Sequence, residues 1–301
     1  MEISSEKDFD IKRLTTFKIG GKIKEVFFPQ NLEEFEQILK ENKDIKVFGN
    51  LSNTLISSDG YNGKIVLTTK MNNIKIDETR VVADAGVKGP KLSQEVYKNG
   101  LSGLEFMIGF PGSIGGEVCM NASANKQAIS DTLTSVICYS KDKGLVKFSK
   151  DEMEFAYRTS RCQCEDLIVL QAEFILSKKN KDEIQSQMES NLEFRKAHQP
   201  SLSLPNCGSI FKNPQGDSAG RLLETIGAKE LTVGGVKVWE NHANFIVNAN
   251  SGTSLDVITL MHTMYKKVKE KYNIELEPEI RFLGGNNEKE NELCNILYKT
   301  K

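Results

Sequence analysis

Residues 109–116 constrain the backbone of this chain more than any other stretch. Four of these eight residues are glycine, and Pro111 fixes its own φ angle. This composition predicts a tight turn with few side chains, in which backbone amides are open to a bulky ligand. Successive amides in such a turn form a concave anion site, which favours a phosphate or pyrophosphate. An ordinary glycine-rich turn is an equally weighted alternative.

Two common nucleotide-binding signatures are absent from the sequence. No Gly-x-Gly triplet occurs, which excludes the dinucleotide fingerprint of the doubly wound fold. No Gly-Lys pair is followed by serine or threonine, so the P-loop is excluded as well. A nucleotide bound at residues 109–116 therefore requires another architecture.

The bulk composition narrows the class of protein. A length of 301 residues predicts about two domains. The 40 basic and 41 acidic residues leave a net charge of −1, so no basic excess is available for nucleic acid. The sequence contains neither an apolar run of membrane-spanning length nor the layout of a signal peptide. We expect a cytoplasmic protein with no membrane or nucleic-acid partner.

The cysteine and histidine residues do not predict a disulfide framework or a metal site. The six cysteines are scattered, and Cys162 and Cys164 have no second pair at zinc-ligand spacing. The three histidines are equally dispersed. We interpret the cysteines as reduced thiols and expect no metal.

Local patterns predict helices alternating with strands. Asn31 and Glu34 have the spacing of a capping box, and Pro90 suits the start of a helix that Gly100 closes. A cluster of proline and serine at 199–205 indicates a domain boundary nearby. The other expected helices are 182–198, 219–226 and 254–272, and the expected strands are 45–48, 64–68, 81–83, 134–139, 145–148, 167–176, 236–239, 244–247 and 276–283.

A second constellation lies at residues 206–214. A turn of small residues presents the hydroxyl of Ser209, and Lys212 and Asn213 follow within one strand's reach. Together with residues 109–116, this segment closely resembles the UDP-N-acetylenolpyruvoylglucosamine reductases, the MurB family of flavoenzymes of peptidoglycan precursor synthesis.

The resemblance covers nearly the whole chain in the right order, and the chain is most similar to the shorter variety of the family. The matching segments are 15–21, 49–53, 103–106, 111–116, 120–122, 157–158, 207–214, 219–220, 234–235, 242–248 and 277–281. Two departures stand out. Leu51 replaces a glycine of the family's Gly-x-Gly-Ser-Asn, and residues 123–127 differ from the family's continuation after Ala122. If position 51 requires a positive φ angle, its leucine carries strain of about 1 kcal/mol or more.

The resemblance implies an α+β fold. A PCMH-type, vanillyl-alcohol-oxidase-like portion of two lobes, 1–62 and 63–199, would hold FAD, and an α+β domain at 200–301 would bind the substrate. The last strand, near 277–283, is a candidate to return to the flavin site. The implied FAD-binding residues are Gly49, Asn50, Ser52, Asn53, Pro111, Gly112, Ser113, Ile114, Gly115, Gly116 and Asn121.

The implied reaction is the reduction of an enolpyruvyl ether by FAD and NADPH, a step of cell-wall biogenesis on which cell shape and division depend. Arg158, always charged, would hold the substrate carboxylate. Glu279 would act in protonated form, or through a proton shared with the substrate, to stabilise developing charge. Ser209 would deliver a proton to carbon. Tyr157, Lys212 and Asn213 would contact the UDP-sugar.

Other interpretations compete with these. Read alone, Arg158 and Glu279 suit solvated surface residues and Ser209 suits a turn. A sugar or alcohol oxidase of the same fold is one rival, although no histidine precedes His198 to tether a flavin. A non-catalytic binding paralogue is another. We expect a monomer or a weak homo-oligomer.

Overall fold

The computed structural model describes residues 3–299, which form two compact units. Unit 1 contains the described residues up to Ser5, together with Val26–Asn50 and Ile65–Arg195. Unit 2 contains Glu6–Glu25, Leu51–Lys64 and the described residues from Lys196 onward. This division differs from the expected parts 1–62, 63–199 and 200–301, but both place a boundary within residues 195–200.

Unit 1 is built on a five-stranded antiparallel sheet of order β12-β11-β13-β7-β6. β11 (Leu133–Ser140) and β12 (Gly144–Ser149) form the expected hairpin, which turns at Gly144 with a φ of 69°. β13 (Ile168–Ile175) pairs with β7 (Arg80–Asp84), so that Ala172 faces Ala83. These residues are buried in one apolar cluster, to which α2 (Gly89–Lys98) also contributes. The sheet is therefore the core of unit 1.

Local signals explain how the helices of unit 1 begin. The side chain of Asn31 accepts a hydrogen bond of 3.0 Å from the amide of Glu34 and caps α1 (Leu32–Glu41). α1 buries Phe35 and Ile38, as its helical spacing predicts. The remaining elements are β3 (Lys46–Phe48), η2 (Thr68–Lys70), β6 (Ile74–Asp77), β8 (Leu101–Ser102), η3 (Glu105–Gly109), α3 (Ile114–Cys119), β9 (Ser123–Ala124), β10 (Gln127–Ala128), η4 (Ile129–Asp131), η5 (Asp151–Met153), α4 (Arg161–Cys164), β14 (Ser177–Lys178) and α5 (Lys181–His198).

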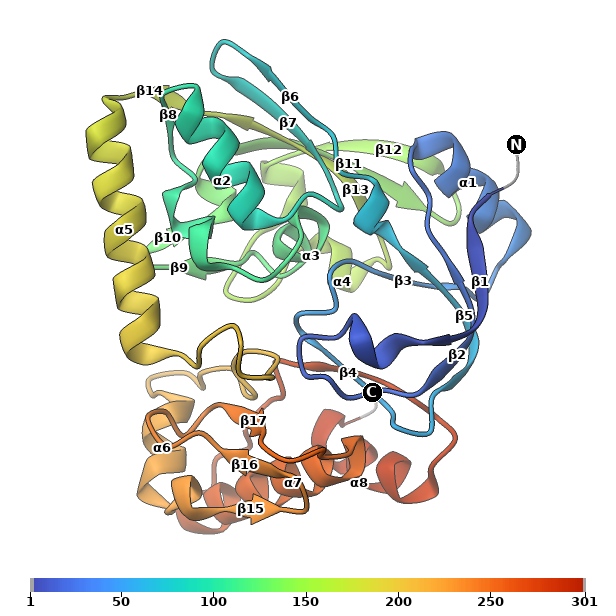
Figure 1. Cartoon of the computed structure of the whole chain (residues 1–301), viewed down its shortest axis with the longest axis vertical. Helices are drawn as coiled ribbons and strands as arrows, with labels where there is room; N and C mark the ends of the chain where they lie inside the picture. The colour runs from blue at the N-terminus through green and yellow to red at the C-terminus, as the bar shows by residue number, and fades with distance from the viewer. Residues whose placement is uncertain (1–2, 300–301) are drawn as a thin grey trace. The chain divides into compact units, whose positions relative to one another are not determined.

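Unit 2 packs a long helix against a small sheet. α7 (Ser254–Tyr272) begins at a capping box between Thr253 and Asp256. It lies along the three-stranded antiparallel sheet β15-β16-β17 (Figure 1). The apolar side of α7 and the inner residues of the sheet share one buried cluster. The elements of this sheet and its surroundings are α6 (Ala219–Thr225), η6 (Ala228–Glu230), β15 (Thr232–Val233), β16 (Val236–Val238) and β17 (Ile246–Asn248).

Short strands near the start of the chain complete the fold. β4 (Thr54–Ile56) pairs in parallel with β18 (Arg281–Leu283) within unit 2. A four-stranded sheet has the order β1-β2-β5-β3. Its first three strands run through points at which the chain passes from one unit to the other: β1 (Ser5–Asp10), β2 (Lys22–Phe27) and β5 (Tyr61–Leu67). Two further elements are η1 (Ile11–Arg13) and α8 (Glu288–Tyr298).

The structure confirms most of the expected helices and strands and corrects several boundaries. β5 begins at Tyr61 rather than residue 64, because pairing with its neighbours extends it. β17 begins at Ile246, two residues later than expected. β18 covers only Arg281–Leu283 of the expected strand 276–283. Elements that the sequence does not predict include β1, β2, β4, α3 and α8, as well as β6, α4 and several two-residue strands.

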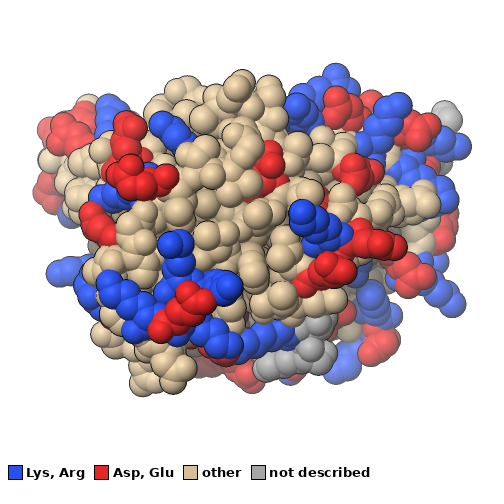
Figure 2. Space-filling view, turned by 90° about the horizontal axis from the view of Figure 1, so that it is seen from below, with Lys and Arg blue, Asp and Glu red and all other residues tan. Residues whose placement is uncertain are grey.

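Charged side chains of both signs are interspersed on the face shown in Figure 2. Uncharged residues cover most of the centre of this face, and residues of both charges occur around it. Across residues 3–299, no helix is both long and apolar enough to cross a membrane.

Candidate active site

The glycine-rich stretch of unit 1 is a loop that leads directly into α3. The amides of Ile114 and Gly115 donate to the carbonyls of Val87 and Ala85, both at 2.9 Å, which fastens the loop to the end of β7. A Cβ on Gly115 would lie 2.9 Å from the Cβ of Ala85, so only glycine fits there. The sequence predicted an open turn, but the second half of this stretch is helical.

The other amides of the loop remain available to a ligand. Within the described part of the chain, the amides of Gly112, Ser113 and Gly116 donate to no partner. The hydroxyl of Ser113 is also buried without a partner there. A Cβ on Gly116 would meet only the Ser113 hydroxyl, at 3.9 Å, so a ligand atom can approach this backbone. Three available amides beside an unpartnered hydroxyl suit a phosphate.

A second predicted loop reaches the first within unit 1. The side chain of Asn50 donates a hydrogen bond of 2.5 Å to the carbonyl of Pro111. A Cβ on Gly49 would lie 2.1 Å from the Ser113 hydroxyl, so a side chain at this position would require that hydroxyl to move. The predicted cofactor residues of unit 1 thus converge, and their buried unpartnered groups fit the pyrophosphate of FAD.

Leu51, the departure from the family pattern, follows this loop in unit 2. Its φ angle is 53°, the left-handed value that the glycine of the family pattern would adopt without strain. Its side chain is 4% exposed. Burial of the side chain therefore offsets the backbone strain. Ser52 and Asn53, the next predicted cofactor residues, lie in the same turn and are half-buried.

We expect glycine to be tolerated better than alanine at position 51. Leu51→Ala loses the buried side chain and keeps the strain, whereas Leu51→Gly loses the side chain and relieves the strain. The free energy of unfolding of Leu51→Gly should therefore exceed that of Leu51→Ala by about 1 kcal/mol. Denaturant titration measures this as a higher midpoint concentration for Leu51→Gly. Leu55, fully buried in the neighbouring strand β4, is the matched control, where the alanine variant should be the more stable. The same order at both positions would contradict this account of Leu51.

Arg158 lies in a two-residue turn of unit 1. Ala156 and Thr159 exchange backbone hydrogen bonds of 3.2 and 3.3 Å around it, and Arg158 itself has a φ of 55°. Its Nη1 donates to the hydroxyl of Ser123 at 3.0 Å. Its guanidinium lies 5.4 Å from the centre of the Tyr157 ring, and Tyr157 is 54% exposed. A positive φ is uncommon for a residue other than glycine, asparagine or aspartate.

The turn of Arg158 is tied to the end of α3. The side chain of Asn121 donates 3.0 Å to the carbonyl of Ala156, and its Oδ1 is buried without a partner in the described residues. Gln163 donates 3.0 Å to the carbonyl of Arg158. Asn121 thus connects the predicted phosphate loop to the predicted catalytic arginine. Ser123, which lies in the departure at 123–127, is a contact that the sequence did not reveal.

In unit 2, Ser209 and Glu279 lie on neighbouring segments. The amide of Glu279 donates to the carbonyl of Ile210 at 2.8 Å, and Ser209 forms a β-bridge with Phe245. The side chain of Asn53 donates 3.0 Å to the carbonyl of Glu279. A predicted cofactor residue and two predicted catalytic residues therefore share one hydrogen-bonded region.

Asn244 organises this region and was not predicted as a site residue. It is 4% exposed, and its side chain accepts from the amide of Phe211 at 3.0 Å and donates to the Phe211 carbonyl at 2.8 Å. Its own carbonyl accepts from Ile210 at 2.9 Å. The sequence offered one signal for Asn244, its position in the family motif at residues 242–248. The motif alone does not indicate whether Asn244 or His242 has the more important role.

Cys207 and His242 flank the same segments. Burial raises the pKa of the Cys207 thiol well above its usual range, and the charge of Glu279 adds to the effect. Nδ1 of His242 accepts from the amide of Asn244 at 3.1 Å, and burial lowers the pKa of this histidine. Among residues 3–299, no three His, Cys, Asp or Glu side chains are grouped so as to hold a metal ion.

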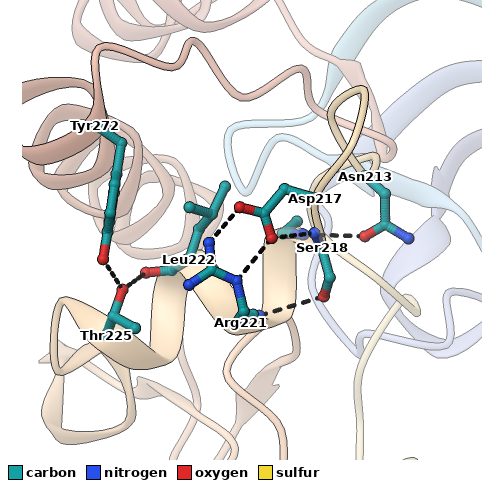
Figure 3. Close-up of polar contacts among 8 residues, drawn as sticks. Asn213, Asp217, Ser218, Arg221, Leu222, Thr225 and Tyr272 are labelled. Atoms are coloured by element: carbon teal, nitrogen blue, oxygen red, sulfur yellow. Dashed lines mark hydrogen bonds and ion pairs between the residues drawn. The ribbon is translucent and has the colours of Figure 1, made fainter.

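The two predicted polar substrate contacts of unit 2 have structural partners. Nζ of Lys212 forms an ion pair of 2.6 Å with Glu277. Oδ1 of Asn213 accepts 3.0 Å from the amide of Ala219 and helps to start α6 (Figure 3). In the same view, Asp217 pairs with Arg221, which lowers the pKa of Asp217 to about 2. Asn213 is thus oriented by α6.

Known proteins match this chain along most of its length. A FAD-binding domain family matches residues 23–148, and the C-terminal domain of UDP-N-acetylenolpyruvoylglucosamine reductase matches residues 199–283. The reductase of that name from Caldicellulosiruptor saccharolyticus is 39% identical over 94% of this chain and 93% of its own. The one from Latilactobacillus sakei is 38% identical over 92% and 93%.

A solved structure agrees with these matches. The crystal structure of UDP-N-acetylenolpyruvylglucosamine reductase from Thermus caldophilus has a TM-score of 0.80 and 31% identity, covering 94% of this chain and all of the other. The expected fold is confirmed: a PCMH-type, vanillyl-alcohol-oxidase-like FAD-binding portion precedes a C-terminal α+β portion.

The fold and the matched domain define a flavoprotein, an FAD-binding oxidoreductase. Within that class, both the matched C-terminal domain and the relatives that are similar along most of the chain point to a single family. The chain belongs to the UDP-N-acetylenolpyruvoylglucosamine reductase (MurB) family of peptidoglycan synthesis.

Proposed function

We propose that this protein uses NADPH and FAD to reduce UDP-N-acetylglucosamine enolpyruvate to UDP-N-acetylmuramate. The hydrogen bond from the amide of Glu279 to the carbonyl of Ile210 carries the proposal, because it joins the segments of a carboxyl and a hydroxyl that this chemistry requires. Family membership supplies the reaction class. We further propose that the protein works in the cytoplasm, as a monomer or a weak homo-oligomer.

FAD would lie on the amides of Gly112, Ser113 and Gly116, beside Asn50, and when bound and reduced by NADPH it would supply the hydride. A Cβ on Gly116 would meet only the Ser113 hydroxyl, at 3.9 Å, so a dinucleotide can approach the backbone there. Ser52, Asn53 and Asn121 complete the proposed cofactor set. Pro111, Ile114 and Gly115 would shape the loop.

The proposed catalytic residues manage charge and protons on the substrate. Addition of hydride to the vinyl group leaves negative charge that spreads into the substrate carboxylate. Arg158 would hold that carboxylate, since a guanidinium binds it through two parallel hydrogen bonds. A protonated Glu279 would donate a hydrogen bond to the growing charge. Ser209 would transfer its hydroxyl proton to the neighbouring carbon and recover a proton through a relay.

Substrate binding is assigned to one residue next to Arg158 in unit 1 and to two residues that follow Ser209 in unit 2. Tyr157 offers an exposed ring next to Arg158. Lys212 and Asn213 offer an ammonium and an amide to the UDP-sugar. Because Lys212 is paired with Glu277, its role would require exchange of that ion pair for a substrate phosphate.

The decisive experiment measures NADPH consumption by the FAD-loaded protein with and without the enolpyruvyl sugar nucleotide. We expect fast consumption only with the substrate, and one lactyl ether formed for each NADPH. Consumption that is independent of the substrate would contradict the proposal. Flavin that stays with the denatured polypeptide would favour an oxidase, and a flavin-loaded protein without turnover would favour a binding paralogue.

A further inference from the structure

Glu117, in α3, carries a buried carboxyl that the proposed mechanism does not use. The residue is 5% exposed, and neither carboxyl oxygen has a hydrogen-bond partner within the described residues. Buried polar groups in folded proteins almost always have partners, and an unpartnered one often marks a ligand. An ionised carboxylate in this position would be costly. The carboxyl of Glu117 therefore calls for a ligand that can serve as its hydrogen-bond partner.

The carboxyl of Glu117 lies against the glycine-rich loop at residues 109–116, which is the proposed phosphate-binding loop. A Cβ added to Gly112 would be 2.8 Å from Oε1 of Glu117, and one added to Gly89 would be 2.7 Å from the same oxygen. Gly89 and Gly112 are also joined by a backbone hydrogen bond of 3.3 Å. Because neither glycine has a side chain, the carboxyl of Glu117 has room between them. Glu117 is thus held beside the amides that remain available to a ligand.

Burial alone raises the pKa of Glu117, to about 8. Ionisable side chains are present on the segments packed around it, but none of them contributes to the shift. They are Arg80 and Asp84 on β7, Lys88 before α2, Asp131 in η4, Arg161, Cys162 and Cys164 on α4, Glu173 on β13 and Cys119 in α3 itself. The carboxyl is therefore mostly neutral at pH 7.

A neutral carboxyl resolves a conflict at this loop. Available amides attract an anion, whereas an ionised glutamate beside them would repel it. In its protonated form the same side chain has an O–H to donate, and a phosphate oxygen is a strong acceptor. We propose that Glu117 is a further FAD-binding residue, which remains protonated and donates a hydrogen bond to a phosphate oxygen of the cofactor.

The inference rests on the proposed use of FAD at this loop, and it makes cofactor affinity depend on pH. Below pH 8 the donor is present. Above pH 8 the wild-type protein should bind FAD progressively more weakly, by roughly tenfold or more between pH 7 and pH 9.5. Glu117→Gln keeps a neutral donor of the same size, so its affinity should stay within about threefold across that range.

The test measures FAD affinity of the flavin-free, full-length protein by quenching of FAD fluorescence at pH 6 to 9.5. Glu105→Gln is the matched control, since Glu105 is a buried glutamate of the same unit whose carboxyl accepts from the amide of Gly103 at 2.9 Å. That variant should retain the pH dependence of the wild-type protein. Circular dichroism at each pH verifies folding.

Three outcomes overturn the assignment. An affinity of the wild-type protein that does not change with pH would exclude it, whatever the variants do. An equal loss of affinity in the wild-type protein and Glu117→Gln would show that another group titrates. No binding of FAD at any pH would refute the proposed cofactor site itself, and the inference with it.

Discussion

Ser209→Ala should leave the reduction of FAD by NADPH intact and slow the turnover of the enolpyruvyl substrate by about 10²–10⁴-fold, the usual contribution of a positioned proton donor. The reason is that the first half-reaction requires no proton on substrate carbon. Stopped-flow absorbance of the flavin separates the two half-reactions, because each changes its colour. The reduced flavin should persist in the variant when the substrate is added.

Ser203→Ala is the matched control, since Ser203 is an exposed serine of the preceding segment, bonded only to Ser201 in the described residues. It should behave as the wild-type protein in both half-reactions. If Ser209→Ala loses both half-reactions equally, the hydroxyl is not the proton donor. Unchanged turnover would exclude it as well.

Elements coded by short-range signals could be predicted from the sequence. The caps at Asn31 and Thr253 start α1 and α7, and Gly227 ends the α6 region with a φ of 69°. The hairpin of β11 and β12 follows from its turn residues. In each case the determining contacts lie within a few residues of the chain.

Elements that depend on distant partners could not be predicted. β4 is a strand of three residues that pairs with β18, near the other end of the chain. No periodic pattern of that length distinguishes a strand from a loop. α3 was missed for another reason: it contains Gly115 and Gly116, and its stability comes from burial of Ile114 and Val118 rather than from helix propensity.

The candidate site shows the same limit. The glycine loop, the turn of Arg158 and the segment of Ser209 are visible in the sequence because they are motifs. Glu117 is not, since a glutamate in a short helix is usually exposed, and only the fold shows that it is buried between Gly89 and Gly112. Asn244 likewise depends on hydrogen bonds to residues more than thirty positions away.

Two substitutions at Glu279 should differ in a way that identifies its role. Glu279→Ala removes the hydrogen-bond donor, and we expect it to slow substrate reduction by about 10²–10³-fold, as for the loss of one donor to developing oxygen charge. Glu279→Gln keeps a neutral donor and should lose roughly tenfold. Flavin reduction by NADPH should be unaffected in both variants.

The difference between the two variants tests whether Glu279 acts through hydrogen bonding or through a transferred proton. Glutamine can donate a hydrogen bond, but it cannot deliver a proton to carbon, so an equal and severe loss in both variants would contradict the donor role. Glu275→Gln is the control, because Glu275 is an exposed glutamate of the preceding segment whose carboxylate pairs with Lys269 at 2.8 Å. It should retain full turnover. A loss there would mean that the segment, rather than the carboxyl of Glu279, is what the reaction requires.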